Sequence, residues 1–314
     1  MQSTANIRIG ISGWRYKPWR GTFYPEDLVQ KKELEYASRQ FNSIELNGSF
    51  YSLHSPEAHQ RWHDETPDDF QFSVKGSRFI THMRRLKDVE IPLANFFSQG
   101  IFRLGKKLGA FLWQFPPNFK YDRNRFEDFF ELLPKTWADA ADFGEKFTAL
   151  PSKKTSFEIP AGFENRKLRH TIEIRNETFV SEEFIALLRR NGIGLVVADT
   201  VEWPLLMDVT QDFVYCRLHG SEQLYASGYD DEALNLWSER IVAWSRGEEV
   251  TDGRKASAKD APKRTKRDVY VYFDNDMKVR APFDAKKLTA RIADLLKSSA
   301  TSHAALPIHI PANY

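Results

Sequence analysis

Residues 212–220 read DFVYCRLHG, a run of aromatic and apolar residues that closes with an arginine, a histidine and a glycine. Most of it, Phe213–Gly220, has the aromatic and β-branched content of a buried strand. Because successive strand side chains point to opposite faces, Arg217 and His219 share one face and Leu218 lies on the other. The run therefore predicts a buried strand that carries polar groups at its C-terminal end.

Seven further segments have the same character, and helical segments separate them. The predicted strands besides Phe213–Gly220 are Ile7–Trp14, Ser43–Phe50, Phe70–Lys75, Ala110–Phe115, Thr171–Arg175, Gly194–Thr200 and Val269–Asp274. Helices are predicted over Asn124–Leu133 and Ser181–Arg190 and from about Asp284 onward. Eight strands that alternate with helices predict an α/β fold, a TIM-like (β/α)8 barrel. An open doubly wound sheet is the alternative, disfavoured because no glycine-rich phosphate motif follows the first strand.

Two stretches interrupt the alternation within residues 1–314, which we otherwise interpret as a single barrel domain. Residues 134–170 lengthen the link between the fourth helix and the fifth strand, with a short helix expected near Trp137–Phe147. Residues 247–267, GEEVTDGRKASAKDAPKRTKR, contain almost no large apolar group. Since such a composition buries too little surface to offset its ordering entropy, we expect a mobile, dispensable insertion. Its basic side chains leave a nucleic-acid contact open as an alternative to a solvated loop.

Composition narrows the class of protein. The 314 residues are 41% hydrophobic and 28% charged, as in ordinary globular proteins. The net charge of +2 gives no global electrostatic argument for nucleic acid. One cysteine, Cys216, excludes an internal disulfide and a zinc site built on thiolates. No run of 18 apolar residues occurs and no signal-peptide pattern opens the chain, so we expect a cytoplasmic protein without a membrane partner.

Polar residues recur near the C-terminal ends of the predicted strands, where barrel enzymes have their active sites. They are Glu45, Asn47, Ser73, Lys75, Gln114, Glu173, Arg175, Asp199, Arg217, His219 and Asp274. Ionised groups inside a barrel cost several kcal/mol each unless they are paired, so this set either pairs internally or serves a ligand. His219 is the best candidate for proton transfer because the ordinary pKa of histidine lies near neutrality.

Structural interpretations remain open for single members of this set. Glu173 and Arg175 could neutralise each other and fill the barrel, and Glu45 could accept hydrogen bonds from Lys75 for packing alone. Three other histidines, His54, His59 and His63, are expected at the surface beside the second helix, and His170 at the N-terminal end of its strand. His82, in the loop after the third strand, could reach the mouth of the barrel.

The segment Gly13–Pro25, GWRYKPWRGTFYP, follows the first predicted strand and is dense in aromatic and basic residues. Its side chains, Trp14 among them, could stack on a sugar or a base or hold a phosphate. They could equally form an aromatic plug over the barrel. Phe50 and Tyr51, after the second strand, pose the same alternative.

Seven ordered blocks of the chain resemble the YecE-like proteins, a family known as a domain of unknown function. The blocks are IGISGWRYKPWRGTFYP, FNSIELNGSFY, PDDFQFSVKGSRFITH, FLWQFPPNF, EIRNETF, YCRLHG and VYVYFDND, between residues 9 and 276. The resemblance implies a TIM-barrel-like fold but no established reaction. The family has been likened to sugar isomerases and to apurinic endonucleases, both of which hold metal ions with carboxylates and imidazoles. Two departures bear on the chemistry: Asp274 stands where the family usually has asparagine, and Asn176 where it often has histidine.

These features favour an enzyme that acts at the barrel mouth on a phosphorylated or polyhydroxylated substrate, by isomerase-like or phosphoester hydrolase-like chemistry. Catalytic roles as base, ion ligand or proton donor are expected for Glu45, Glu173, Asp274 and His219. The expected substrate-binding residues are Trp14, Asn47, Tyr51, Lys75, Gln114, Arg175, Asp199, Arg217 and Asn275, with Lys75, Arg175 and Arg217 on the anionic groups. A carboxylate-rich mouth suits Mg²⁺ or Mn²⁺ better than zinc. The alternative is a non-catalytic protein that binds nucleic acid or a sugar phosphate.

Overall fold

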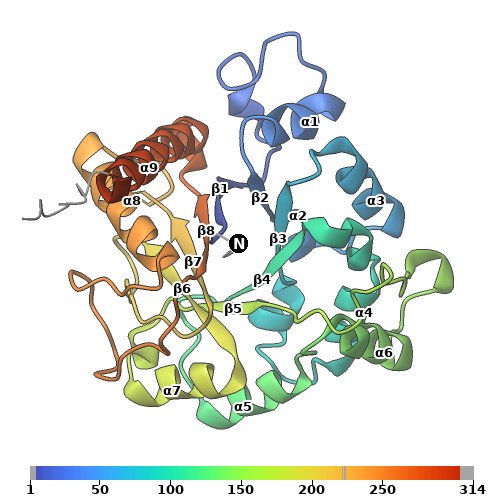
Figure 1. The fold of residues 1–314 in the computed structure, drawn as a ribbon. Coiled ribbons are helices and arrows are strands. Elements are labelled where there is room, and N and C mark those ends of the chain that lie inside the picture. The colour runs from blue at the N-terminus through green and yellow to red at the C-terminus, as the bar shows by residue number, and fades with distance from the viewer. Residues whose placement is uncertain (1–4, 221, 223, 305–314) are drawn as a thin grey trace, which may run out of the picture.

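The computed structural model describes residues 5–220, 222 and 224–304. Eight parallel strands close into a barrel in sequence order, with β8 paired back to β1, and helices surround it (Figure 1). The predicted (β/α)8 barrel is therefore confirmed. The strands are β1 (Ile7–Ser12), β2 (Ser43–Leu46), β3 (Gln71–Lys75), β4 (Leu108–Gln114), β5 (His170–Glu173), β6 (Ile193–Asp199), β7 (Phe213–Leu218) and β8 (Asp268–Phe273).

The helices agree with local sequence signals. They are α1 (Glu33–Ser38), α2 (Gly48–Tyr51), α3 (Pro56–Glu65), α4 (Glu90–Ser98), α5 (Arg123–Leu132), α6 (Trp137–Phe147), α7 (Glu182–Asn191), α8 (Asp231–Ser245) and α9 (Ala281–Ala304). In α7, the Ser181 side chain accepts a hydrogen bond from Phe184 N, and Gly192 ends the helix with a φ of 71°. A serine cap and a left-handed glycine fix both ends of this helix. No helix in the described part of the chain is long and apolar enough to cross a membrane.

The second strand ends earlier than predicted. The sequence prediction of a strand over Ser43–Phe50 is wrong after Leu46, because Asn47 takes helical dihedral angles and α2 follows. A side chain at Gly48 would place its Cβ 2.5 Å from the His54 imidazole, so only glycine fits this close approach. The result places Phe50 and Tyr51 on a helical turn above the barrel instead of along a strand.

Two layers of side chains form the core. The larger cluster fills the space between the barrel and the helices, whereas a smaller one lies inside the barrel. The inner cluster contains Val196, Ala198, Tyr215, Tyr270 and Tyr272. Residues two apart along a strand share a face, so Arg217 follows Tyr215 to the inside of the barrel. By the same rule, Asp199 points outward from β6.

Residues 134–170 connect α5 to β5 and contain α6, which begins with a reciprocal cap between Thr136 and Asp139. Trp137 packs between Phe102 and Phe163, with ring centroids 4.9 Å and 5.3 Å away. Further along, Ser156 N donates a hydrogen bond to the carbonyl of Ser98 at the end of α4. The segment therefore covers the outside of the barrel next to α4.

Residues 247–267 connect α8 to β8 without a helix or strand, and their packing differs from the expected mobile loop. Asp208 accepts hydrogen bonds from the backbone N–H groups of Ala256 and Ser257, at 2.8 Å and 3.0 Å. Val250 and Arg267 are buried. The segment lies against residues 200–212, which join β6 to β7 without a helix (Figure 1). The segment therefore covers the barrel where a helix between β6 and β7 would otherwise lie. Composition alone could not reveal this arrangement, because backbone hydrogen bonds hold much of the segment in place.

Candidate functional site

An ion cluster lies at the C-terminal end of the barrel, centred on Arg217 of β7. Its guanidinium contacts Glu45 of β2 through two hydrogen bonds, Nη2 to Oε1 at 2.9 Å and Nε to Oε2 at 3.1 Å. It also donates to Glu173 of β5 at 2.6 Å and to Asp274, which follows β8, at 2.8 Å. We call Arg217, Glu45, Glu173 and Asp274 the Arg217 cluster. All of its side chains are fully buried except that of Asp274, which is 14% exposed.

Further hydrogen bonds from Tyr215, Ser12 and Arg175 satisfy the carboxylates of the cluster. Tyr215 donates its hydroxyl to Glu45 Oε2 at 2.7 Å, and Ser12 donates to Glu45 Oε1 at 2.9 Å. Arg175 binds Glu173 through Nε at 2.7 Å, and its guanidinium stacks 4.0 Å above the Trp203 ring. Buried carboxylates are tolerated only when their oxygens are satisfied in this way.

Ion pairing in the cluster shifts the pKa of Glu173 and of Arg217 in opposite directions. Burial by itself would raise the pKa of Glu173, but attraction by Arg217 and Arg175 outweighs it and holds that pKa well below its ordinary value. Burial would likewise lower the pKa of Arg217, yet the three carboxylates raise it well above its ordinary value. Both directions favour the ionised forms of Glu173 and Arg217 at neutral pH.

Arg217 has no N–H group left for a ligand. Its nitrogens donate hydrogen bonds to Glu45, Glu173 and Asp274. Two further acceptors lie close to them, Ser12 Oγ at 3.4 Å from Nη2 and His219 Nε2 at 3.5 Å from Nη1. Internal pairing, the structural alternative left open by the sequence, accounts for this arginine. It is thereby removed from the predicted set of anion-binding residues.

His219 lies beneath the mouth and not in it. Its side chain is fully buried, and the rings of Trp203 and Tyr225 cover it at centroid distances of 5.4 Å and 5.5 Å. Its Nδ1 lies 3.1 Å from Asp274 Oδ2, although no hydrogen bond of good geometry joins them. His219 can therefore act on a ligand only through Asp274, which differs from the direct proton transfer expected from the sequence.

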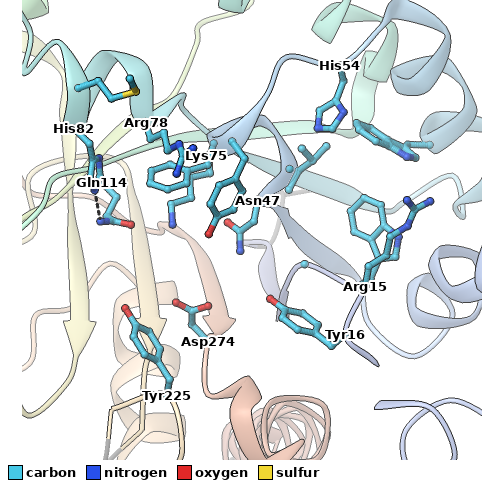
Figure 2. A pocket seen from close by; sticks show the side chains of 18 of the residues that line it. Arg15, Tyr16, Asn47, His54, Lys75, Arg78, His82, Gln114, Tyr225 and Asp274 are labelled. Atoms are coloured by element: carbon cyan, nitrogen blue, oxygen red, sulfur yellow. Dashed lines mark hydrogen bonds between the residues drawn. The ribbon is translucent and has the colours of Figure 1, made fainter. Parts of the chain in front are cut away.

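A cavity of about 1040 Å³ opens above the Arg217 cluster (Figure 2). Its walls combine cations, aromatic rings, amides and imidazoles. The cations are Arg15, Lys75, Arg78 and Arg175, and the aromatic rings are Trp14, Tyr16, Phe50, Tyr51, Trp62 and Tyr225. The amides are Asn47 and Gln114, and the imidazoles are His54 and His82. Among the described lining residues, Asp274 is the one carboxylate. A deep, mostly apolar cavity with a few converging polar groups is the usual form of a small-molecule site.

Lys75, at the end of β3, reaches the floor of this cavity. Its side chain is 8% exposed, and its amine lies 4.3 Å from the centre of the Phe50 ring. Figure 2 shows the amine directed into the cavity, between Asn47 and Gln114 and across from Asp274. Burial and the charge of Arg217 lower the pKa of Lys75 to about 8 although the nearby carboxylates oppose the change.

Two further cations stand at the rim. Arg15 and Arg78 are exposed, and neither forms an ion pair or a side-chain hydrogen bond with the described residues. The Arg78 guanidinium lies 5.3 Å from the centre of the Tyr51 ring. Together with Lys75, these side chains give the cavity three positive groups without a direct carboxylate partner, an arrangement that attracts anions.

Two neighbouring carboxyl groups of the mouth have opposite pKa shifts. Burial would raise the pKa of Asp274, but Arg217 and His219 hold it far below its ordinary value. Burial and the negative charge of Asp274 raise the pKa of Asp276 well above its ordinary value, and Tyr16 is its hydrogen-bond partner. The surroundings therefore favour the ionised form of Asp274 and the protonated form of Asp276.

The donor set does not fit the Mg²⁺ or Mn²⁺ expected from the sequence. Three carboxylates do converge, as predicted, but Arg217 occupies the point where their oxygens meet. Within the described residues, no group of three His, Cys, Asp or Glu side chains has the arrangement of a metal site. A guanidinium at the centre of the carboxylates excludes a cation from the same point by like-charge repulsion.

Comparison with known sequences places the chain in a family. Residues 8–306 match the model of "Protein of unknown function DUF72". The chain belongs to this family. It is also similar to YunF of Bacillus subtilis (strain 168), with 31% identity over 118 residues, and to YecE of Escherichia coli (strain K12), with 29% identity over 113 residues. Each match covers 36% of this chain and about two fifths of the relative, 41% and 39%. The YecE-like resemblance expected from the sequence is thereby confirmed.

Solved structures of the DUF72 family have the same fold. The protein from Thermotoga maritima MSB8 matches with a TM-score of 0.66 and 24% identity, covering 93% of this chain and 99% of that one. The protein from Enterococcus faecalis V583 matches with a TM-score of 0.65 and 17% identity, covering 91% and 95%. At these identities the likeness establishes the barrel alone.

The predicted site residues fall into three groups in this DUF72 protein. Those that line the cavity are Trp14, Asn47, Tyr51, Lys75, Gln114, Arg175 and Asp274. Those that lie beneath it are Glu45, Glu173, Arg217 and His219. Two lie outside the site: Asp199 points out of the barrel and accepts a hydrogen bond from Trp237 of α8, and Asn275 donates to Asp284 of α9. Their outward position follows from the strand alternation, since Ala198 and Asp274 take the inward places.

Several site residues were missed or left undecided. Tyr215 lies two residues before Arg217 and could have been found by strand alternation. Tyr225 and Trp203 come from loops, where no periodic pattern places a side chain. His59, expected at the surface, is fully buried against Trp62. His82 does line the cavity, and burial lowers its pKa to about 4.

Proposed function

We propose that this protein is an enzyme that acts on a small organic anion, phosphorylated or sugar-like, in the cavity at the barrel mouth. One observation carries the proposal: Lys75, Arg15 and Arg78 surround the cavity without direct carboxylate partners. Taken with Arg175 and Lys75, the Arg217 cluster has three positive and three negative groups, which leaves the rim cations Arg15 and Arg78 without an offsetting carboxylate among the described residues of the site. A ligand with a phosphate or carboxylate group would supply the missing negative charge.

The other lining groups suit a polyhydroxylated or ring-bearing ligand. The amides of Asn47 and Gln114 flank the amine of Lys75 and can both donate and accept hydrogen bonds (Figure 2). The Trp14 and Tyr51 rings also face the cavity, where a sugar ring or a planar group can pack on them. These contacts would orient the ligand over the floor of the cavity.

The reactive groups at the floor are Asp274 and Lys75. Asp274 is the carboxylate among the described lining residues. Its lowered pKa keeps it ionised, so it can accept hydrogen bonds from a ligand or offset a positive charge there, and Arg217 and His219 fix its position. We therefore assign Arg217, Glu45, Glu173 and His219 a positioning role, in which they hold Asp274 without touching the substrate. Isomerase-like and hydrolase-like reactions both remain within this description.

The alternative of nucleic-acid binding through residues 247–267 has little support. Arg254 pairs with Glu177 at 3.0 Å, and Lys255 pairs with Glu249 at 2.8 Å. Lys259 pairs with Glu182 at 2.9 Å. These carboxylates offset three of the seven basic side chains of the segment, and we propose no nucleic-acid contact there.

Ligand-dependent thermal stability tests the proposal. Melting temperatures would be measured with inorganic phosphate, ribose 5-phosphate and unphosphorylated ribose at matched ionic strength. Binding raises stability by RT ln(1 + [L]/Kd), about 2.7 kcal/mol at one hundred times Kd. We expect ribose 5-phosphate to stabilise the protein more than ribose does. Arg78→Gln should raise the Kd for ribose 5-phosphate about tenfold or more and so reduce this stabilisation.

The matched control is Arg246→Gln, since Arg246 is exposed after α8 and does not line the cavity. This variant should respond to ligand as the wild type does. Equal responses of wild type and Arg78→Gln, or no response of the wild type to either anion, would contradict an anion site at the mouth.

A further inference from the structure

The structure buries two lysines among the residues it describes, and their amines have different surroundings. Lys107 is 2% exposed and donates hydrogen bonds to the carbonyl oxygens of His63 at 2.5 Å and Thr66 at 2.8 Å. The amine of Lys75 forms no hydrogen bond or ion pair with the described residues, and it faces the cavity. A buried amine without a protein partner is available to a ligand.

The surroundings of Lys75 make its neutral form more populated than that of an ordinary lysine. The Phe50 ring covers one side of the amine, and no carboxylate of the described residues lies within ion-pairing distance. Burial and Arg217 lower its pKa to about 8. An ordinary lysine, with a pKa near 10.4, is almost fully charged at pH 8, so the neutral fraction of Lys75 there is on the order of a hundredfold larger. A neutral amine has the free electron pair that a nucleophile needs.

We propose that Lys75 is an amine nucleophile that forms an imine with a carbonyl group of the substrate. This inference rests on the proposed function, since it assigns an aldehyde or ketone to the small anion that the cavity would bind. The substrate class becomes a phosphorylated or carboxylated carbonyl compound, such as an open-chain sugar phosphate. The rim cations Arg15 and Arg78 would hold the anionic end while the carbonyl reaches the floor.

The reaction balances with groups that are present. The neutral amine of Lys75 attacks the carbonyl carbon, a C–N bond forms, and the carbonyl π electrons move to oxygen. One proton passes from the nitrogen to that oxygen through solvent water in the open cavity, which gives a neutral amino alcohol. A second proton from solvent lets the hydroxyl group leave as water, and the nitrogen lone pair forms the C=N bond of a protonated imine. The Asp274 carboxylate, across the cavity floor (Figure 2), can offset the positive charge on this nitrogen. No oxidant, reductant or metal ion is required.

Reductive trapping tests this assignment. The full-length protein would be incubated with glycolaldehyde phosphate, or with glycolaldehyde, in the presence of sodium cyanoborohydride, which reduces an imine to a stable secondary amine. Peptide mapping by mass spectrometry then measures the label at each lysine. We expect Lys75 to be labelled at least tenfold faster than the exposed Lys263 at pH 8, and inorganic phosphate to protect it.

Two variants provide controls. Lys75→Arg keeps the positive charge but removes the nucleophilic amine, so its fast label should disappear. Lys107→Arg removes a buried lysine that has no access to the cavity and should be labelled at Lys75 as the wild type is. Because the mapping resolves each lysine in the wild-type protein, the result does not depend on how well the variants fold.

The outcomes separate this inference from the proposed function. Stabilisation by phosphate with no preferential label at Lys75 would overturn the imine and leave the anion site intact. A fast label from both aldehydes, without protection by phosphate, would support the nucleophile and overturn the anion site. Equal labelling of Lys75 and Lys263 in every condition would sink the imine.

Discussion

Arg217 and Glu45 face each other across the barrel, from β7 to β2, and join through two hydrogen bonds of 2.9 Å and 3.1 Å with both side chains fully buried. Glu173 and Asp274 bind the same guanidinium. Arg217 on β7 therefore connects β2, β5 and the residue that follows β8. It also holds Asp274, which is the one carboxylate among the described residues that line the cavity.

Replacing this arginine should destabilise the fold. Arg217→Met would leave three carboxylates near the barrel axis with only Arg175 and Lys75 to offset them, and we expect the free energy of unfolding to fall by about 3–5 kcal/mol. Urea denaturation measures this change, with the exposed Arg246→Met as the control. A fall below about 1 kcal/mol would mean that the cluster does not hold the barrel together.

The cluster also predicts how stability responds to acid. The pKa of both Glu173 and Asp274 lies below its ordinary value in the folded protein. Carboxyl groups with a lowered folded pKa contribute stability that is complete above their unfolded pKa, about 4, and is lost as pH falls further. We expect the free energy of unfolding to drop by a few kcal/mol between about pH 5 and pH 3. Glu173→Gln should flatten this drop, and an equally steep curve for that variant would contradict the assignment.

The packed insertion gives a third prediction. The N–H group of Arg267 donates a hydrogen bond to the carbonyl of Ser245, so a short Gly/Ser linker can span the gap left by residues 247–267. The replacement would free the Asp208 carboxylate and expose the side chains that the segment covers. We expect a loss of about 2–5 kcal/mol, whereas Lys263→Ala at an exposed position should change stability by less than about 0.5 kcal/mol. Calorimetry measures the stability of both variants. A melting transition left unchanged by the replacement would support the interpretation of residues 247–267 as a mobile loop.

Strand alternation accounts for what the sequence could predict. The inward series at the ends of β2, β5 and β7 was correct, because polar residues two positions apart lie at the end of each of those strands. The rule was misapplied at Asp199, where the small Ala198 takes the inward place. The barrel itself followed from the eight strand signals. The early end of β2 was missed because Asn47 and Gly48 begin a helical turn there.

Pairing within the site could not be predicted in the same way. Glu45 and Arg217 are 172 residues apart, and which carboxylates meet the guanidinium depends on barrel closure and strand register. The sequence therefore left both the ligand-binding and the internally paired interpretation of Arg217 open. Burial decides between them, since an arginine with every donor satisfied inside the protein has none left for a substrate.

Asp276 is the residue whose replacement should stabilise the protein. Its Oδ1 atom is buried without a hydrogen-bond partner, and burial and Asp274 raise its pKa well above the ordinary value. A carboxyl group with a raised folded pKa makes the protein less stable as pH rises above its unfolded pKa, because the unfolded chain ionises while the folded chain stays protonated. Asp276→Asn removes this ionisation and keeps a group that can bond to Tyr16. We expect a gain of about 1–3 kcal/mol at pH 7 and a flatter dependence of stability between about pH 5 and pH 8.

Urea denaturation across that pH range, with Asp142→Asn as the exposed control on α6, measures the effect. The control should follow the wild-type curve at every pH. If Asp276→Asn instead lowers stability equally at all pH values, then Asp276 is an ionised and well-paired carboxylate. The mouth would then hold two negative charges beside Lys75, which would weaken the case for an anionic substrate as well.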